Sequence, residues 1–444
     1  MVKVALAALL FLAGCQRSSE SALRRRLASQ ISGTIQLPSG IVEVSSELHL
    51  APGAHDLEIA GSGTTLKASD EFKGRAILVA DGVRNLRLRD VSIDGNRIVF
   101  EKALEAAPPE RPLREAYVNN GVLLDRVGGA EIANVTLANV ANLAMVVSRS
   151  SKIRIHQLRV EDSGSLDAHG HSNATGGVAF EDGTSDFEVR SSIFRRIRGN
   201  ALWTRPRVDN GVFAANRFDA IGRDAILIWN GSNMRVEDNT GARIGYPSEM
   251  VDALGQPAAI ATLGDVDHST YARNQFEDVN GKCLDLDGFH DGIVMRNQCV
   301  NRSPVAEYPF GHFGIVVNNT DPAMHPANIE LTGNVIDGAK YGGLFLIGAG
   351  HRVIGNRFVH LNRIECDADK AGCNYVRDEP KMLESGIYLG RGGAHPAEAR
   401  GNVIRDNVIS GYRMKTRCIA AAPGVSLQAN TLAANECSDE ASPR

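Results

Sequence analysis

The chain has 444 residues and a formal net charge of −4, so its length suits a repeating architecture better than one compact domain. Because the charges nearly balance and no basic face emerges, nucleic acid is not expected as a partner. Aromatic residues make up 5% of the chain against 45 glycines, a composition typical of many turns and thin layers rather than of a thick core.

The first residues resemble a targeting segment. A short apolar run follows Lys3, too short to cross a membrane, and ends in the letters LAGC at 12–15. This ending resembles a bacterial lipobox, which implies cleavage before Cys15 and a diacylglycerol on its sulfur. Gln16 favours the outer membrane, by analogy with bacterial sorting. We therefore expect residues 1–14 to be a lipoprotein signal peptide on a lipid-anchored cell-envelope protein; the alternative is an ordinary signal peptide followed by a chance cysteine.

Residues 15–30 are expected to form a tether and a short helix. Leu23 and Leu27 are four positions apart among the arginines at 24–26, which suits a helix that covers the open end of a sheet structure. The arginines could instead contact anionic lipid close to the anchor, and the two interpretations are compatible.

An asparagine followed by one variable and one apolar residue recurs along the chain. Several of the intervals between these asparagines are 23 residues. One asparagine at the same bend of successive coils would let the side-chain amides hydrogen-bond to one another and satisfy backbone groups of the turn. The series consists of Asn216, Asn239, Asn274, Asn297, Asn334, Asn356, Asn407 and Asn430, with Asn134, Gln157 and Ser192 as looser members.

Two short apolar segments accompany each asparagine. Their period of two predicts strands, and three strands in about 23 residues make one coil of a solenoid whose coils stack roughly 4.8 Å apart. The segments before the asparagine are 187–189, 234–236, 329–331 and 425–427, and those that begin nine residues after it are 225–229, 283–287 and 343–347.

With this repeat the chain resembles the pectate-lyase-like right-handed parallel β-helix superfamily. The resemblance includes the opening IQLPSGIVEVSSELHL, which is similar to first coils in that superfamily. It implies an all-β fold, a right-handed single-stranded parallel β-helix of about twelve coils over residues 31–437, with a C-terminal tail at 438–444. The superfamily match specifies fold rather than function.

Insertions interrupt the repeat on one side. The larger ones enter between the second and third strands of a coil, and two smaller ones follow the third strand, so loops wall the face of the third strands from both edges. We therefore expect a binding groove there. The insertions lie at 97–120, 163–176, 245–256, 302–312 and 363–384, and the smaller ones at 319–327 and 391–397.

Alternation predicts which side chains of the third strands point outward. One column runs Ala179, Trp203, Leu227, Ala261, Asp285, Val316, Phe345, Tyr388, and the other Glu181, Arg205, Trp229, Leu263, Asp287, Asn318, Ile347.

Both tryptophans fall in these columns, where exposed aromatic faces would form platforms for sugar rings. Arg205 could pair with a uronate carboxylate or stack on Trp229. The predicted substrate contacts are Trp203, Arg205, Trp229, Glu181 and Tyr388, with His169 and His171 from the insertion DAHGHSN.

Asp285 and Asp287 are the predicted catalytic pair. They are two residues apart on one strand, so their Cα atoms lie roughly 6.6 Å apart, near the lower limit of the separation in inverting glycosidases. Repulsion would raise one pKa and leave the other low, which makes an acid and a base. His290 and His312 are expected to carry a proton or to orient the pair.

Other interpretations of these residues stay open. Aspartates on a strand surface are commonly solvated, and Asp-Gly at 287–288 is ordinary turn chemistry. His169 and His171 could be plain surface or, less readily, metal ligands. We expect no cofactor and no zinc site; calcium is the alternative, with oxygen ligands drawn from Asp265, Asp267, Asp285, Asp287 and Asp291.

Six of the seven cysteines remain after Cys15, an even number that suggests disulfides in an oxidising compartment. Cys299 falls at a core position, so a buried free thiol is the alternative there. The pairs expected from proximity are Cys366 with Cys373, Cys418 with Cys437 and Cys283 with Cys299.

No named enzyme family is matched. Polygalacturonases of this fold carry Asn-Thr-Asp, Asp-Asp, Gly-His-Gly and Arg-Ile-Lys motifs, and the stretches at 170–172, 311–313 and 196–198 depart from them. The setting of Arg205 does not fit the arginine base of pectate lyases.

The hypothesis is a surface-anchored, monomeric enzyme acting on a polysaccharide, as a hydrolase or as a lyase or epimerase on uronic acids. The alternatives are a non-catalytic carbohydrate-binding or adhesive lipoprotein and a structural surface protein. The expected partners are a glycan and, through the lipid anchor, the membrane.

Overall fold

The computed structural model describes residues 19–252, 255–367, 370, 373, 379, 381–392 and 394–440. It divides into unit 1, Met1–His169 with Asn173–Gly199, and unit 2, Gly170–Ser172 with Asn200–Arg444. Cys15 and the predicted signal peptide lie outside the described residues. Within the described part of the chain, no helix combines the length and apolarity needed to cross a membrane.

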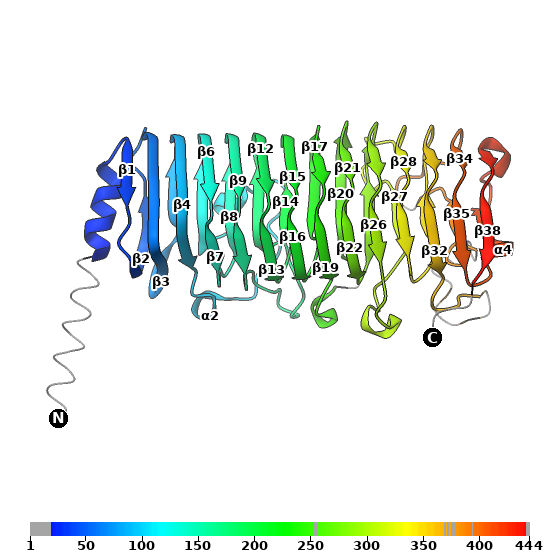
Figure 1. Ribbon diagram of the computed structural model, residues 1–444, viewed down its shortest axis with the longest axis horizontal. Helices are drawn as coiled ribbons and strands as arrows, with labels where there is room; N and C mark the ends of the chain where they lie inside the picture. The colour runs from blue at the N-terminus through cyan, green and yellow to red at the C-terminus, as the bar shows by residue number, and fades with distance from the viewer. Residues whose placement is uncertain are drawn as a thin grey trace, which may run out of the picture. The chain divides into compact units, whose positions relative to one another are not determined.

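Unit 1 begins with a helix over residues 19–29 that packs on the first strands. Leu23 and Leu27 are buried, as their spacing predicted. Arg24 donates to the carbonyl of Ser46 at 3.0 Å, and the Glu20 carboxylate accepts the backbone N–H of Ser45 at 2.9 Å. The helix therefore covers the N-terminal end of the unit (Figure 1).

Parallel strands form the body of unit 1, and each coil contributes one strand to each of three faces (Figure 1). The long strands β2 (Gly40–His49), β3 (His55–Asp81) and β4 (Arg84–Asp94) bend across more than one face, and β1 (Gly33–Gln36) pairs with β3. The first face continues with β6 (Gly128–Ala133), β9 (Ser151–His156) and β12 (Ser185–Arg190); the second with β7 (Thr136–Ala138), β10 (Arg159–Glu161) and β13 (Ile193–Ile197); the third with β5 (Asn120–Asp125), β8 (Leu143–Ser148) and β11 (Gly176–Glu181).

Unit 2 repeats the same three-faced coil. Its first face holds β15 (Asp209–Ala214), β18 (Arg235–Glu237), β21 (Thr270–Ala272), β25 (Ile293–Met295), β28 (Glu330–Thr332), β31 (Arg352–Ile354), β34 (Val403–Arg405) and β37 (Thr431–Ala433). The second face holds β16 (Arg217–Ile221), β19 (Thr240–Ile244), β22 (Gln275–Val279), β26 (Gln298–Val300), β29 (Val335–Asp337), β32 (Arg357–Leu361), β35 (Val408–Gly411) and β38 (Glu436–Asp439). The third face holds β14 (Leu202–Thr204), β17 (Ile226–Ser232), β20 (Ala258–Asp267), β23 (Lys282–Asp287), β27 (Ile315–Asn318), β30 (Leu344–Leu346), β33 (Ile387–Leu389) and β36 (Ile419–Ala421), and the short β24 (Phe289–His290) pairs with the end of β20.

A stack of buried asparagines runs along the bend between the first and second faces of unit 2. At Asn274, the side-chain amide donates to Asn297 Oδ1 at 2.8 Å and to the carbonyl of Val236 at 2.8 Å, and the backbone N–H donates to the same Oδ1 at 3.1 Å. This is the ladder that the repeat predicted. Its members are Asn216, Asn239, Asn274, Asn297, Asn334, Asn356, Asn407 and Asn435.

The assignment of Asn430 to this ladder was wrong. Strand pairing aligns Val403 with Thr431, so Asn430 follows Asn402 in a second stack, in which Asn402 N–H donates to Asn430 Oδ1 at 3.1 Å. The interval of 23 residues from Asn407 was a coincidence of spacing. For the same reason 425–427 is not a strand: the 3-10 turn η3 (Leu427–Ala429) follows, and β37 is the first-face strand of this coil.

Of the looser members of the series, Ser192 is buried at the bend and its Oγ accepts the backbone N–H of Leu158 at 3.1 Å, whereas Asn134 and Gln157 were misplaced. Asn134 and Gln157 are exposed and have left-handed backbone conformations, with φ of 51° and 53°. They sit at the bend itself, where asparagine tolerates positive φ, one residue before the buried positions of Val135 and Leu158.

Insertions enter where the sequence predicted them. Unit 1 carries α2 (Arg97–Phe100) and α3 (Leu113–Ala116) between β4 and β5, and unit 2 carries η1 (Ser248–Met250) between β19 and β20 and η2 (Val305–Glu307) between β26 and β27. A further insertion separates β32 from β33, and α4 (Met414–Arg417) lies between β35 and β36. Every one of these connects the second face to the third.

The predicted disulfide pairing is confirmed among the described residues, including a bonded rather than free Cys299. Cys283 joins Cys299 across one coil. The other bonds are Cys366–Cys373 within an insertion and Cys418–Cys437 in the last coil.

Candidate functional site

The third face of unit 2 carries the predicted outward columns in the predicted register. Neighbouring strands align the residues of the first column one by one, and this part of the geometry is confirmed. The aligned residues are Trp203, Leu227, Ala261, Asp285, Val316, Phe345 and Tyr388, and in the second column Trp229 with Leu263 and Asp287 with Asn318.

Asp285 is a partly accessible carboxylate of this face. It lies in β23, with 20% of its side chain exposed, and its Oδ2 is 2.6 Å from the Lys282 ammonium nitrogen. The distance is short enough for a charge-assisted hydrogen bond. Lys282 was missed by the sequence analysis, although its position at the start of the same strand was a usable signal.

Asp287 points from the same strand but is 7% exposed. Its Oδ1 accepts the backbone N–H of Thr320 at 2.7 Å, and its Oδ2 bonds the Thr320 hydroxyl. Burial raises the pKa of Asp287; the Thr320 hydrogen bonds oppose the rise, and the charge of Asp285 adds to it. Thr320 begins the small insertion after β27, so Asp287 also holds that loop on the strand.

Asp224 is a third carboxyl that the sequence analysis missed. It precedes Ala225 at the bend before β17, is 5% exposed and accepts the N–H of Ala258 at 2.8 Å. Burial raises its pKa to about 6, with Arg223 opposing and Asp285 adding to the rise. Its place directly before a predicted third strand was the available signal, but a bend aspartate is too common to single out.

The two predicted histidines occupy different surroundings. His290 lies between Asp265, at 3.1 Å from Nε2, and Asp291, at 2.8 Å from Nδ1. Burial lowers the pKa of His290, but the hydrogen bonds to these two carboxylates outweigh it and the net change is upward. Both ring nitrogens of His290 are therefore hydrogen-bonded to carboxylates other than Asp285 and Asp287. His290 does not orient that pair, contrary to the expectation.

His312 is buried next to the start of β23, where its backbone N–H donates to Gly281 O at 3.1 Å. Burial lowers its pKa to about 3, and the charges of Lys282 and Lys340 act in the same direction. The ring packs edge-on against Tyr341, with centroids 5.7 Å apart. At neutral pH this histidine is uncharged, which suits a packing and positioning role better than a proton carrier.

The predicted exposure of the aromatic platforms was partly wrong. Trp203 is 1% exposed, and Tyr388 is buried, with its hydroxyl donating to Glu379 at 2.9 Å. The reason is that outward-pointing residues of this face can be covered by inserted loops, as Glu379 covers Tyr388. Trp229 remains half-exposed, and the guanidinium of the buried Arg205 lies 5.3 Å from its ring centroid.

Glu181, in unit 1, binds the insertion that contains α3. The buried carboxylate accepts the N–H groups of Leu113 at 2.6 Å and Arg114 at 3.1 Å, at the start of α3. A predicted open contact for substrate is therefore a side chain that fastens a loop over the third face of unit 1.

His169 and His171 belong to different units; His169 is exposed and His171 half-buried. Among the described residues no group of three or more His, Cys, Asp or Glu is placed to hold a metal ion.

The five aspartates considered for calcium do not converge. Asp265 and Asp291 flank His290, Asp267 lies 2.9 Å from His268, and Asp287 is bound by Thr320. The chemistry this face offers is thus acid–base: one accessible, ion-paired carboxylate beside two buried carboxyls with raised pKa.

Comparisons with known proteins agree on the fold. The model of a right handed beta helix region matches residues 120–245, and no curated protein matches the sequence. A family 28 exopolygalacturonase of Yersinia enterocolitica has a TM-score of 0.55 at 11% identity, covering 94% of this chain and 75% of that one.

Two further structures are similar. A mutant of the periplasmic alginate epimerase AlgG has a TM-score of 0.53 at 13% identity, covering 91% of this chain and 84% of that one. ORF18 of Geobacillus virus E2 has a TM-score of 0.50 at 14% identity and covers 71% of this chain, which spans 57% of that protein's length. The chain therefore has the right-handed parallel β-helix fold.

Proposed function

We propose that this protein is an enzyme that acts on a polysaccharide laid along the third face of unit 2. The observation that carries the proposal is the juxtaposition on this face of Asp285, which is accessible and ion-paired to Lys282, with Asp287 and Asp224, whose pKa values are raised. Proteins of similar fold include an exopolygalacturonase and an alginate epimerase, which supports a glycan as substrate.

The roles follow from the environments of the carboxyls. In hydrolysis, Asp287 in its protonated form donates a proton to the glycosidic oxygen as the C–O bond breaks. Asp285, which is ion-paired with Lys282, takes a proton from the water that adds to the sugar carbon. The spacing of the two residues on one strand gives room for inversion. On a uronic acid the same base removes the C5 proton; loss of the C4 oxygen, which takes a proton from Asp287, then gives a lyase product, whereas return of a proton to the opposite face of C5 gives the epimer.

The test combines a glycan array with a depolymerisation screen on the protein lacking residues 1–15. New reducing ends report hydrolysis, and ultraviolet absorption of unsaturated products reports a lyase. Asp285→Asn and Asp287→Asn are each expected to lower turnover by about 10² or more while glycan binding is retained. Asp287→Asn keeps an acceptor for the Thr320 N–H, so the loop stays held, and Asp321→Asn serves as a surface control. Unchanged turnover in both variants would remove these carboxyls from the chemistry.

A non-catalytic glycan binder is the second candidate. The observation in its favour is that both oxygens of Asp287 are engaged by Thr320, which gives that carboxyl a structural purpose. Glycan retention without turnover of any retained glycan would select this candidate.

We further propose that the chain is anchored in the bacterial envelope, in the outer membrane, through a lipid on Cys15. The support is the LAGC sequence at 12–15. Membrane fractionation with mass analysis of the N-terminal peptide tests this: wild type is expected in the membrane fraction with a diacylglycerol on Cys15, and Cys15→Ala in the soluble fraction. An unmodified Cys15 peptide from the wild type would contradict it.

A further inference from the structure

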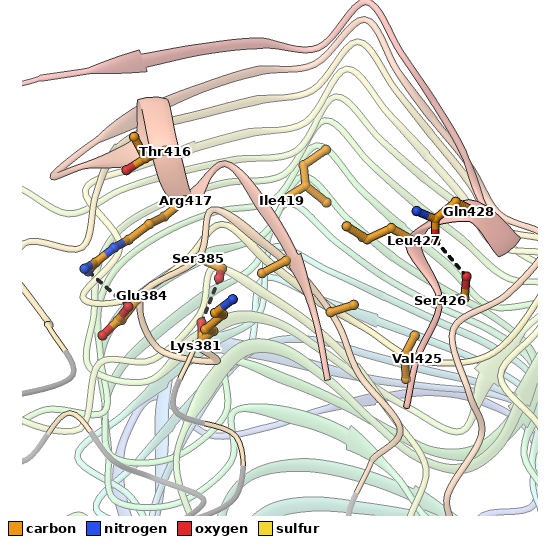
Figure 2. Close-up of a pocket in the computed structure, with 12 residues that line it drawn as sticks. Lys381, Glu384, Ser385, Thr416, Arg417, Ile419, Val425, Ser426, Leu427 and Gln428 are labelled. Carbon is orange, nitrogen blue, oxygen red and sulfur yellow. Dashed lines mark hydrogen bonds and ion pairs between the residues drawn. The ribbon is translucent and has the colours of Figure 1, made fainter. Parts of the chain in front are cut away.

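A cavity of about 610 Å³ lies at the C-terminal end of the third face of unit 2 (Figure 2). It is formed around β36, which pairs with β33 on one edge. Within the described residues no strand pairs with the other edge of β36, so the stack of coils ends here. The volume falls within the range of roughly 300–1,000 Å³ typical of small-ligand sites.

One wall of the cavity is apolar. Ile419 comes from β36, and Val425 and Leu427 come from the segment that leads into η3. Figure 2 shows Ile419 and Leu427 from these two neighbouring segments with the cavity between them. Ile419 and Leu427 are half-exposed, so a ligand with an apolar face would remove this surface from water.

The rim of the cavity is rich in hydrogen-bond donors. Lys381 is exposed at one side, and the exposed Ser426 and Gln428 lie at the other (Figure 2). Ser426 donates its hydroxyl hydrogen to Gln428 Oε1 at 3.0 Å, which leaves the Gln428 amide nitrogen as a donor toward a ligand.

The remaining charges of the rim neutralise one another. Among the described residues, Arg417 pairs with the buried Glu384 at 3.1 Å and lies 3.4 Å from Asp367, and Arg413 also pairs with Asp367, so two arginines balance two carboxylates. Lys381 therefore supplies the unbalanced charge of the rim, and it favours a ligand with a negative group.

The cavity continues the column that contains Asp285. Strand pairing places Val316, Phe345, Tyr388 and then Ala420 after Asp285, one strand at a time, and Ala420 lines the cavity. Four strand spacings put the cavity about 19 Å from Asp285 along the face. Tyr388, between the two, is buried and hydrogen-bonded to Glu379, so a polymer with one sugar unit in the cavity and another at Asp285 has to pass over that insertion.

We propose that this cavity binds one uronate unit of a polysaccharide, with the carboxylate at Lys381, ring hydroxyls at Ser426 and Gln428, and the apolar ring face on Ile419 and Leu427. The proposal rests on the proposed function in taking a glycan as the ligand. It assigns the substrate class, an anionic glycan, and a recognition site separate from the carboxyls that carry out the chemistry.

The test measures binding of hexagalacturonate, an anionic probe, and cellohexaose, a neutral one, by calorimetry. Lys381→Ala is expected to weaken hexagalacturonate binding about fivefold, as for the loss of one solvent-accessible charge contact, and to leave cellohexaose unchanged. Ala420→Trp, which fills the cavity, is expected to weaken hexagalacturonate binding at least as much. Lys415→Ala, which removes the same charge from α4 outside the cavity, is the matched control and should bind like wild type.

Hydrogen exchange locates the ligand. Bound hexagalacturonate should slow exchange in residues 381–385 and 417–428, and Ala420→Trp should abolish this protection. Equal affinity of wild type, Lys381→Ala and Ala420→Trp for hexagalacturonate would overturn the inference. It would also be overturned if light scattering showed that the protein self-associates and this association, rather than the glycan, protected these segments.

These outcomes separate the two proposals. If Asp287→Asn abolishes turnover while the cavity variants bind normally, the cavity inference fails and the enzyme proposal stands. If binding depends on the cavity while no glycan is turned over, the cavity inference stands and the enzyme proposal fails.

Discussion

The buried carboxyl of Asp224 makes a prediction about stability against pH. Its pKa in the folded protein is raised from the ordinary value of 3.8 to about 6. Between these values the folded chain holds a proton that the unfolded chain releases, so folding is favoured at low pH and the advantage is lost as the pH rises through 6. Asp224→Asn stays neutral and keeps an acceptor for the Ala258 N–H, so the variant should not show this loss.

The magnitude follows from the size of the change. Each unit of pKa corresponds to about 1.4 kcal/mol. Because the unfolded carboxyl is already partly ionised at pH 4, wild type should lose about 2.4 kcal/mol relative to Asp224→Asn between pH 4 and pH 7. Desolvation of the charged form is the cause, since Asp224 is 5% exposed and the opposing Arg223 nitrogen is 3.9 Å away.

Urea unfolding at pH 4, 5.5 and 7 measures the difference, and exchange protection of the Ala258 amide reports the same change locally. Asp321→Asn, at a surface carboxylate that accepts the local Ala323 N–H, is the control and should change little with pH. The reasoning is refuted if Asp224→Asn is as stable relative to wild type at pH 4 as at pH 7, or if it becomes less stable as the pH rises.

Three further predictions address the fold and the site. Asn297→Ala removes hydrogen bonds to Asn334 and Tyr271 and leaves buried donors of Asn274 without an acceptor, so it should lower the free energy of unfolding in urea by about 3–5 kcal/mol. Asn435→Ala, at the half-exposed end of the ladder, should lower it by about 1 kcal/mol. Equal losses in the two variants would contradict a cooperative ladder. The pKa of His312 is lowered to about 3, so its ring carbon proton should show no NMR titration from pH 8 to pH 5 while that of His290, whose pKa is raised, titrates above pH 6.5; a His312 midpoint near 6.5 would show that it is solvated. A bound glycan should change the fluorescence of half-exposed Trp229 rather than that of buried Trp203, so Trp229→Phe should lose the signal and Trp203→Phe should keep it. The reverse would contradict a glycan site at Trp229.

Periodicity gave most of the fold because a stacked coil repeats the same environment at every turn. Each strand contributes inward apolar residues at alternate positions, and each bend between the first and second faces of unit 2 holds a side-chain amide. The sequence pattern and the structure therefore repeat with the same period. The failures came where two bends offer similar environments. Asn402 with Asn430 and Asn407 with Asn435 form neighbouring stacks five residues apart, and spacing alone could not assign Asn430 to one of them.

The sequence predicted which way the side chains of the candidate site point, but not how exposed they are to solvent. Alternation placed Asp285 and Trp203 on the outward side of the third face, and the strand pairs agree. What covers an outward side chain depends on irregular loops that have no period. Thus Asp287 is bound by Thr320 and Tyr388 by Glu379, contacts that join segments whose sequences carry no common pattern.

The same loops explain why three carboxyls of one face can differ in acidity. On an open β-helix face, aspartates at successive positions would share the same solvent and ordinary pKa values. Here a bend buries Asp224, an insertion covers Asp287, and Lys282 pairs with the exposed Asp285. In the proposed mechanism, the acid would therefore differ from the base in what covers each aspartate rather than in its position on the strand. It follows that shortening the loop at 321–327, while keeping Asp287 and Thr320, should lower the pKa of Asp287 toward its ordinary value, because burial falls while the Thr320 hydrogen bonds, which lower the pKa, remain; NMR titration of the Asp287 carboxyl measures the change.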